Sequence, residues 1–265
     1  EFSKLDRPSL AAPTVPTESG ATAVPQGEWV PRKPPQYGKF SISGGLIQYS
    51  QNINFLTAGN KTVSQWLTPT IKGSAELWLN PEFHLELFIR QSSFKMNNPM
   101  EGSEPGSLNM SLSQYQIKAK YNYELDSSAR APQFQVALGI GSFQALPDKS
   151  NPLSLSGLSY GGTLLGFKGT FAVSEESPID LSLYFNYFLS KTLKDSADAS
   201  PSGVQINDFG LILRYVKTLN LAYVFELSFE SYSSDFDAAT GSRSDPSNSI
   251  SHKLMSTLAG IEYSF

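Results

Sequence analysis

Apolar and polar residues alternate along most of the chain, from Gly38 to its last residue. The first of ten such segments has Phe40, Ile42, Gly44 and Leu46 at every second position. Successive side chains of a β-strand point to opposite faces, so a period of two predicts strands with one apolar and one polar face. No stretch has a convincing helical period. We predict strands at 38–50, 70–79, 83–95, 111–124, 133–144, 157–173, 179–190, 204–217, 221–234 and 250–265.

The predicted connections alternate in length along the chain. Segments 51–69, 96–110, 145–156, 191–203 and 235–249 are long and polar, whereas 80–82, 125–132, 174–178 and 218–220 are short. Short turns at one end and long loops at the other are typical of transmembrane β-barrels. None of the predicted strands contains proline, as paired strands require. The predicted fold class is all-β, a transmembrane antiparallel up-and-down barrel of about ten strands over residues 38–265. The alternative is a soluble barrel or sandwich with its apolar face inward.

Charged residues gather on the polar faces of these strands. The apolar faces carry only Lys95, Lys217 and Lys253, each near a strand end. A lysine at the membrane midplane on the lipid side costs roughly 2–4 kcal/mol, so the apolar faces are expected outside. Six aromatic residues are expected near the short-turn end, as an interfacial girdle: Tyr121, Tyr123, Tyr215, Tyr223, Tyr263 and Phe265.

The inward charges form a predicted lumen charge network. Its members are Lys72, Glu76, Glu86, Arg90, Lys118, Lys120, Lys168, Asp180, Asp208, Arg214, Glu226, Glu230 and Glu262. In one interpretation these charges pair across a narrow lumen and fill it, since barrels of about eight strands are filled by side chains. In another, cations on the earlier strands and anions on the later ones create a transverse field, as in a narrow pore for small polar solutes.

Residues 1–37 differ from the rest of the chain. They contain seven of the 17 prolines and no periodic apolar pattern. Such a segment buries too little surface to fold alone, so we expect an extended or disordered segment separate from the barrel. It is either a tail, which could fold into the lumen, or a tether captured by a partner protein. Trp29, Pro34 and Pro35 are the candidate partner-binding residues, because extended proline segments bind at low entropic cost.

The last strand carries the most specific motif. Ile261, Tyr263 and Phe265 alternate with polar or small residues and end the chain on an aromatic side chain. This run resembles the closing strand of Gram-negative outer-membrane β-barrels, which the barrel assembly machinery reads as its signal. The resemblance implies an outer-membrane location among lipid and lipopolysaccharide, with periplasmic termini and extracellular long loops. It singles out no subfamily and does not include the proline-rich leader.

Enzymatic chemistry has little support in the sequence. The two histidines are His84 and His252. Asp235, Asp237 and His252 faintly resemble the rim site of omptin-like proteases, but no opposing carboxylate pair is evident. For a lipid hydrolase, Ser251 and His252 are adjacent in one strand and therefore face opposite sides. The histidine spacing predicts no zinc site and the acidic loops match no calcium motif, so no metal is expected.

Composition adds exclusions rather than a function. The absence of cysteine excludes a disulfide-stabilised fold and a cysteine nucleophile. A pI near 5.3 without a basic block argues against a nucleic-acid-binding protein. The 40% apolar content is typical of a soluble protein, but a barrel needs apolar residues only at alternate positions. The sequence therefore predicts a non-enzymatic outer-membrane anchor or interaction platform without a cofactor. The alternatives are a narrow channel and a rim protease or lipid hydrolase.

Overall fold

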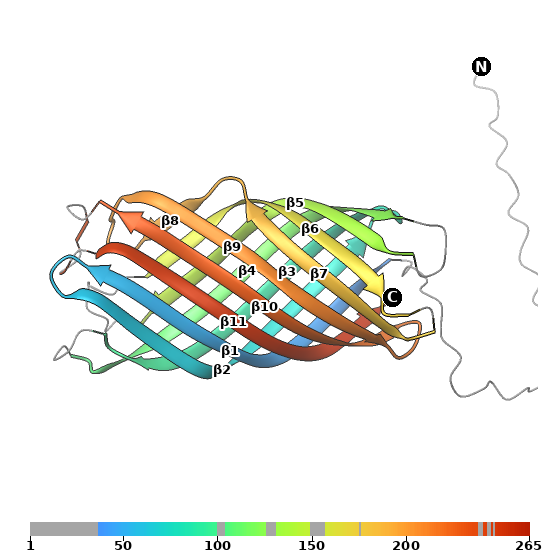
Figure 1. Cartoon of the computed structure of the whole chain (residues 1–265), viewed down its shortest axis with the longest axis horizontal. Helices are drawn as coiled ribbons and strands as arrows, with labels where there is room; N and C mark the ends of the chain where they lie inside the picture. Colours follow the sequence, from blue (N-terminus) through green and yellow to red (C-terminus); the bar gives the residue numbers. More distant parts are fainter. Residues whose placement is uncertain are drawn as a thin grey trace, which may run out of the picture.

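The computed structural model describes residues 37–99, 104–125, 131–148, 157–174, 176–237, 241–242, 245 and 247–265. These residues form one closed antiparallel β-barrel (Figure 1). Its strands are β1 (Gly38–Phe55), β2 (Gly59–Trp78), β3 (Phe83–Asn97), β4 (Ser107–Glu124), β5 (Gln133–Pro147), β6 (Leu158–Ala172), β7 (Ile179–Phe188), β8 (Thr192–Asp195), β9 (Pro201–Val216), β10 (Leu221–Phe236) and β11 (Ser247–Ser264). No helix that could cross a membrane occurs in this part of the chain.

Neighbouring strands in the sequence are neighbours in the barrel, and the pairing of β1 with β11 closes it. The β6 strand pairs with β7 near one end and with the four-residue β8 near the other. These two short strands therefore occupy one position in the wall, and the barrel has ten strand positions. The predicted up-and-down barrel of about ten strands is confirmed.

Several predicted long loops are largely strand. The segment predicted as loop 51–69 mostly extends β1 and β2, whose pairing continues to Phe55 opposite Gly59. The prediction failed there because residues 51–69 look polar on average. Asn52 and Thr62 face outward, whereas Ile53 and Val63 are buried inside. The strands also reach into the predicted loops 96–110, 145–156, 191–203 and 235–249.

The prediction of proline-free strands was also wrong. Pro69 lies within β2, and Pro147 and Pro201 lie at strand ends. Near Pro69 the register of β1 against β2 shifts between Ile47 and Tyr49, and Leu67 has a φ of 57°. A β-bulge lets a strand carry a residue that cannot donate a ladder hydrogen bond.

The interior has two zones of different chemistry. Near the short turns, which we call the short-turn half, the inward side chains are mainly charged or polar. Toward the other end, the long-loop half, they form an apolar core. That core contains Ile47, Tyr49, Ile53, Phe55, Val63, Met96, Leu108, Met110, Leu112, Phe143, Ala145, Leu158, Tyr160, Leu164, Phe188, Ala199, Ile206, Tyr232, Phe236, Ile250 and Leu254. The barrel is thus filled differently at its two ends.

The outer face reverses this arrangement. In the short-turn half it carries exposed apolar residues such as Leu87, Ile117 and Leu138. In the long-loop half the outward positions of the same strands are mostly polar, as at Ser93 and Ser111. An 18-residue strand such as β1 is about 60 Å long at ~3.3 Å per residue. With a tilt of about 40° it rises roughly 45 Å, whereas the apolar band of a membrane barrel is about 25 Å tall.

Both ends of the barrel chain meet at the short-turn end. The backbone N–H of Tyr37 donates to the carbonyl oxygen of Phe265 at 3.0 Å, so Tyr37 lies beside the C-terminal residue (Figure 1). The predictions for the proline-rich segment, including Trp29, Pro34 and Pro35, lie outside the described residues.

Candidate functional site

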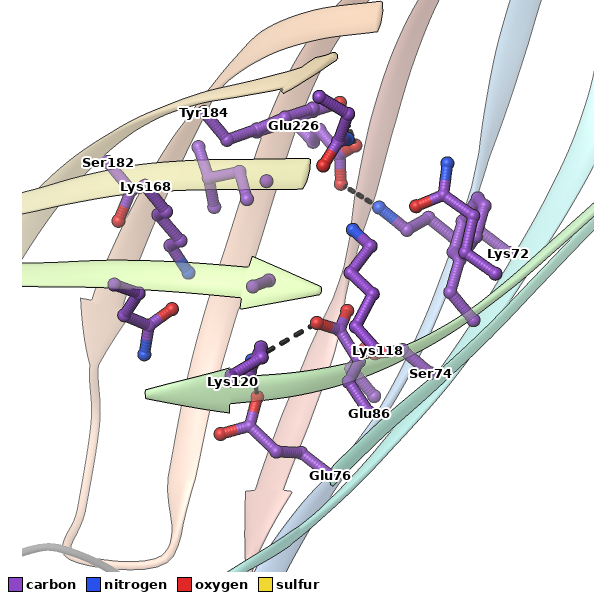
Figure 2. Close-up of a pocket in the computed structure, with 18 of the residues that line it drawn as sticks. Lys72, Ser74, Glu76, Glu86, Lys118, Lys120, Lys168, Ser182, Tyr184 and Glu226 are labelled. Carbon is purple, nitrogen blue, oxygen red and sulfur yellow. Dashed lines mark hydrogen bonds and ion pairs between the residues drawn. The ribbon is translucent and has the colours of Figure 1, made fainter. Parts of the chain in front are cut away.

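The charged short-turn half encloses a cavity of about 150 Å³. It is lined by inward residues of most of the barrel strands, because each strand contributes every second side chain. Figure 2 shows Lys118 and Lys168 reaching into this space, together with Lys72, Lys120 and Glu86. Ala137 and Gly166 also line the cavity, and their small size leaves room in an otherwise crowded lumen.

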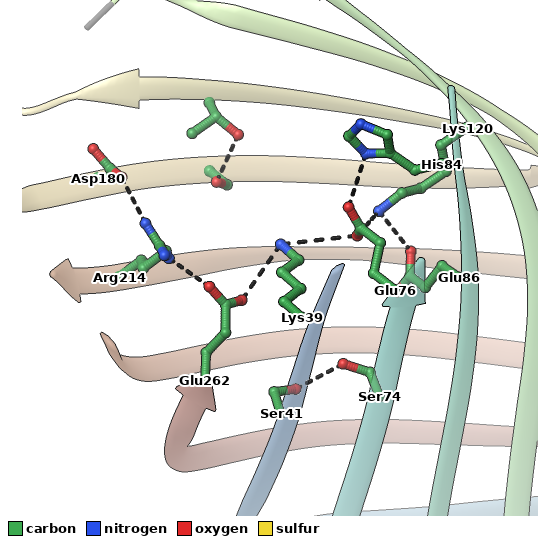
Figure 3. A network of polar contacts seen from close by, with 12 residues as sticks. Lys39, Ser41, Ser74, Glu76, His84, Glu86, Lys120, Asp180, Arg214 and Glu262 are labelled. Atoms are coloured by element: carbon green, nitrogen blue, oxygen red, sulfur yellow. Dashed lines mark hydrogen bonds and ion pairs between the residues drawn. The ribbon is translucent and has the colours of Figure 1, made fainter. Parts of the chain in front are cut away.

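Glu76 is the centre of one ion-pair group at the short-turn side (Figure 3). It pairs with the ammonium of Lys120, accepts a 2.9 Å hydrogen bond from His84 Nδ1, and lies 3.8 Å from Lys39 Nζ. Lys120 in turn lies 3.1 Å from Glu86. His84 Nε2 also lies 3.1 Å from the carbonyl oxygen of Pro81, and the His84 ring stacks on Trp78. This histidine is therefore held between a carboxylate and the backbone of a short turn.

Lys39 connects that group to the opposite part of the wall. Its ammonium lies 3.4 Å from Glu262, which accepts a 2.7 Å hydrogen bond from Arg214 Nε. Arg214 also reaches Asp180 at 3.5 Å (Figure 3). Charges from β1, β2, β3, β4, β7, β9 and β11 are thus joined in one network around the lumen.

Two further contacts cross the lumen closer to the apolar core. Arg90 binds Glu230 through two hydrogen bonds, of 2.5 and 2.9 Å. Glu230 also accepts hydrogen bonds from Gln114 and Tyr232, so its charge is fully hydrogen-bonded. Lys72 pairs with Glu226, to which Tyr184 also donates.

The remaining members of the predicted network have other surroundings. Asp208 accepts hydrogen bonds from the amides of Gln116 and Asn186, at 3.2 and 2.8 Å. Lys118 and Lys168 make no hydrogen bond or ion pair shorter than 4 Å with the described residues. The cations and anions on different strands therefore meet mainly as pairs, and the two lysines are left facing the cavity.

An aromatic layer lies above the charged zone, in the apolar core. The Phe143 and Tyr232 rings stack with centroids 4.1 Å apart, and Tyr160 packs against Tyr232 at 5.6 Å. The Tyr49 hydroxyl and His252 Nδ1 are 2.8 Å apart beside these rings. Sequence reasoning missed this layer because it followed only the inward charges. The available signal was apolar residues at the same inward positions, such as Leu108, Met110 and Leu112.

The geometry contradicts a rim dyad of Asp235 with His252. His252 is buried in the aromatic layer and pairs across strands with Tyr232, whereas Asp235 is exposed on the outer face. Their strand positions differ in parity, so the two side chains lie on opposite sides of the wall. Among the described residues, no cluster of three or more His, Asp or Glu side chains could hold a metal ion.

The residues of the predicted assembly signal share one surface. Ile261, Tyr263 and Phe265 are all about half exposed on the outside of the barrel, near the short-turn end. The predicted girdle residues Tyr121, Tyr123, Tyr215 and Tyr223 are also exposed.

No family model and no curated protein matches the chain. Solved structures with similarity include Ail, the attachment invasion locus protein of Yersinia pestis, in complex with sucrose octasulfate (13% identity, 85% of this chain, 99% of that chain, TM-score 0.33). The outer membrane protein OprG of Pseudomonas aeruginosa has 12% identity over 88% of this chain and 98% of its own, with a TM-score of 0.35. The transport unit of the Escherichia coli autotransporter AIDA-I has 13% identity over 88% and 91%, with a TM-score of 0.41. At these values the similarity carries no information on what this chain binds.

Proposed function

We propose that the chain is a non-conducting outer-membrane anchor that presents its long-loop half as an interaction platform. The observation that supports this function most directly is the filled interior. Ion pairs cross the short-turn half, and the layer of Phe143, Tyr160 and Tyr232 fills the long-loop half. A solute would have to displace both layers to pass. The absence of a rim dyad between Asp235 and His252 removes the specific arrangement that favoured an enzyme.

The outer face supports an orientation in the membrane. The apolar band of the short-turn half is the part suited to lipid, and the polar outside of the long-loop half is suited to water. We place the short turns and both termini in the periplasm and the long-loop half outside the cell, next to lipopolysaccharide. The extracellular part would then be a soluble-type barrel with an apolar core.

The conducting state of the purified barrel tests this proposal. Wild-type protein in a planar lipid bilayer is expected to give no stable unitary current steps. A variant with Phe143→Ala, Tyr160→Ala and Tyr232→Ala opens the aromatic layer and is expected to give measurable current. Heat-modifiable gel mobility checks that both proteins are folded. Stable unitary steps from the folded wild-type protein would contradict the anchor function and favour a narrow channel for small polar solutes.

The channel is the second candidate, and the cavity of about 150 Å³ in the charged half is the observation that favours it. The charged lining would suit polar solutes. Against it stands the aromatic layer, where Tyr49, Phe143 and Tyr160 are at most 1% exposed. The bilayer experiment separates the two candidates directly.

The proline-rich segment is proposed as a periplasmic tether, with Trp29, Pro34 and Pro35 as its contact residues. Support comes from the position of Tyr37 beside Phe265 at the short-turn end. Deletion of residues 1–34 is expected to abolish co-purification of a periplasmic or outer-membrane protein while leaving the barrel folded. An unchanged set of co-purifying proteins would refute the tether.

Ile261, Tyr263 and Phe265 are proposed as the signal for the barrel assembly machinery. Their outward, half-exposed side chains are accessible on the closing strand. Deletion of Phe265 is expected to lower the amount of heat-modifiable barrel in outer-membrane fractions. Replacement of Lys217, an exposed residue near the same end, by Gln serves as the control and should leave that amount unchanged. Equal amounts with and without Phe265 would argue against the signal.

A further inference from the structure

We propose that the long-loop half of the barrel binds an extended, acidic segment of a partner protein along an open strand edge between β8 and β9. The inference deepens the platform function and rests on it, because it names the kind of partner that the platform would hold. It starts from a gap in the strand pairing. The last paired residues of β7 and β9 are Tyr187 and Asn207. Beyond them, toward the long-loop end, β9 pairs with β10 alone.

The β8 strand borders the same gap from the other side, near the long-loop end (Figure 1). It continues the wall position of β7 and pairs with β6, from Leu158 opposite Asp195 to Gly161 opposite Thr192. It forms no ladder with β9 in the described part of the chain, although residues 196–200 connect the two strands directly. All other neighbouring strands of the described barrel form ladders. An unpaired strand edge presents backbone N–H and C=O groups to which another extended chain can bind.

The hydrogen bonds at the far end of β9 show which of its backbone groups face the gap. The N–H of Val216 donates to the carbonyl oxygen of Pro178 on the β7 side, at 2.8 Å. The N–H of Lys217 donates to Leu221 on the β10 side, at 2.9 Å. Successive residues of a strand direct these groups to opposite neighbours. The pairing of β9 has no register shift between Val204 and Val216, so the N–H and C=O of Val204 face the gap.

The same reasoning applies to β8. The N–H of Ser196, just after the strand, donates to the carbonyl oxygen of Gly157 on the β6 side at 2.9 Å. Leu193 lies three residues earlier in a regular ladder, so its N–H and C=O point away from β6 and toward β9. The gap is thus lined by backbone groups of Leu193 on one side and of Val204 on the other.

The inner side of the gap is apolar. Leu193 and Val204 pack against the apolar core but are only partly buried, whereas Ile206, the next inward residue of β9, is 2% exposed. The core is therefore covered less completely along the gap than beside it. An apolar side chain of a strand lying in the gap would cover Leu193 and Val204, and removal of their apolar surface from water would stabilise the complex.

The outer side of the gap is basic. Lys194 is exposed on the outer face of β8 and forms no ion pair shorter than 4 Å with the described residues. Lys191, just before β8, lies over the outward ring of Tyr187 at 5.6 Å from its centroid. The outward residue across the gap, Gln205, is uncharged. An acidic residue at an outward position of the bound strand would pair with Lys194. Because side chains alternate along a strand, the fitting segment is one in which apolar and acidic residues alternate.

The gap is short, which favours a peptide segment over a second barrel. Residues 203–206 of β9 span about 13 Å at ~3.3 Å per residue, which is enough for about four residues of an extended chain. Pro201 begins β9 without an N–H, and Lys191 and Lys194 flank the opposite side. Proline, lysine and short strands are features that limit edge-to-edge association of protein copies.

Fluorescence anisotropy of a labelled peptide tests this edge on the full chain refolded in neutral detergent. The probe is a short synthetic peptide in which valine and glutamate alternate, and protein-free micelles give the background. Saturable binding by the wild-type barrel is expected. The same peptide with methylated backbone nitrogens cannot donate hydrogen bonds to the strand edges, so it should bind about tenfold more weakly.

Two variants locate the binding at the gap. Val204→Pro removes an N–H that faces the gap and leaves the ladder with β10 intact, so it should weaken binding about fivefold. Lys194→Gln removes the charge expected to contact glutamate and should weaken binding about twofold to fivefold. Lys95→Gln, on the outer face of β3, is the matched control and should leave binding unchanged. Heat-modifiable mobility checks that each variant is folded, and Lys194→Gln keeps the test valid if Val204→Pro does not fold.

The absence of saturable binding, equal binding of the methylated peptide, or equal effects of Lys194→Gln and Lys95→Gln would overturn the proposal. A barrel dimer, detected by light scattering, that excludes the peptide would also overturn it and would assign the gap to a second copy. Peptide binding is measured on the purified barrel and does not depend on conductance. Its failure would leave the bilayer result for the anchor standing, whereas current through the wild-type barrel would contradict the anchor and leave the strand edge in place.

Discussion

The contact between Arg90 and Glu230 shows what a single pair of residues contributes to this barrel. It crosses the lumen from β3 to β10 through two hydrogen bonds, and both side chains are at most 5% exposed. A buried ion pair adds little net stability over an apolar replacement, but removing one partner leaves an uncompensated buried charge. Each of these two residues therefore neutralises the buried charge of the other.

Replacing Glu230 by Gln is the test of that pair. We expect a loss of about 3–5 kcal/mol in the free energy of unfolding, because Arg90 keeps its charge without a carboxylate. Denaturant titration of the purified barrel, followed by heat-modifiable gel mobility, measures this loss. The control is the double variant Arg90→Met and Glu230→Met, which should recover most of the stability. A single variant as stable as wild type would mean that water screens the pair.

The sequence could not predict which inward cation would pair with which inward anion. The alternation places Arg90 and Glu230 inside, but which inward cation meets which inward anion depends on strand tilt and on closure of β1 with β11. Lys118 and Lys120 illustrate this limit of prediction, because both lie on the inward face of β4. Lys120 forms ion pairs with Glu76 and Glu86, whereas within the described residues Lys118 forms no ion pair shorter than 4 Å.

The strand is the scale at which the sequence was most informative. The period of two predicted all ten wall positions, because the outer and inner faces of a barrel wall impose opposite chemistry on successive residues. It misjudged where the strands end. Beyond Leu46 the inward residues Ile47 and Tyr49 are apolar and the outward Gln48 and Ser50 are polar. The parity is unbroken while the surroundings change.

A pair of arginine substitutions on β4 tests this change of surroundings. Ile117 and Ser111 both lie on the outer face of the strand, in the apolar band and above it respectively. Ile117→Arg is expected to destabilise the barrel by about 2–4 kcal/mol in lipid vesicles, whereas Ser111→Arg should change its stability by about 1 kcal/mol or less. Denaturant unfolding from vesicles is the measurement. Equal costs at the two positions would contradict the two-zone exterior.

The whole molecule is a barrel with its chemistry reversed between two halves. Where the outside is apolar the inside is charged, and where the outside is polar the inside is an apolar core. The first half has the apolar exterior that the proposed membrane location requires, and the second has an exterior suited to water. In the proposed orientation this arrangement holds a folded, filled structure outside the lipid, as an interaction platform requires. Average composition could not show it, because the two halves offset each other.

The absence of cysteine allows the central claim to be tested by single-cysteine labelling on intact cells. Ser111→Cys, Ile117→Cys and Glu82→Cys place one thiol each on the long-loop half, in the apolar band and in a short turn. With a membrane-impermeant maleimide, we expect Ser111→Cys to be labelled on intact cells and Glu82→Cys only after the outer membrane is permeabilised. Ile117→Cys should be labelled only after denaturation. Labelling of Ile117→Cys and Ser111→Cys to the same extent on intact cells, or of Glu82→Cys without permeabilisation, would contradict the account.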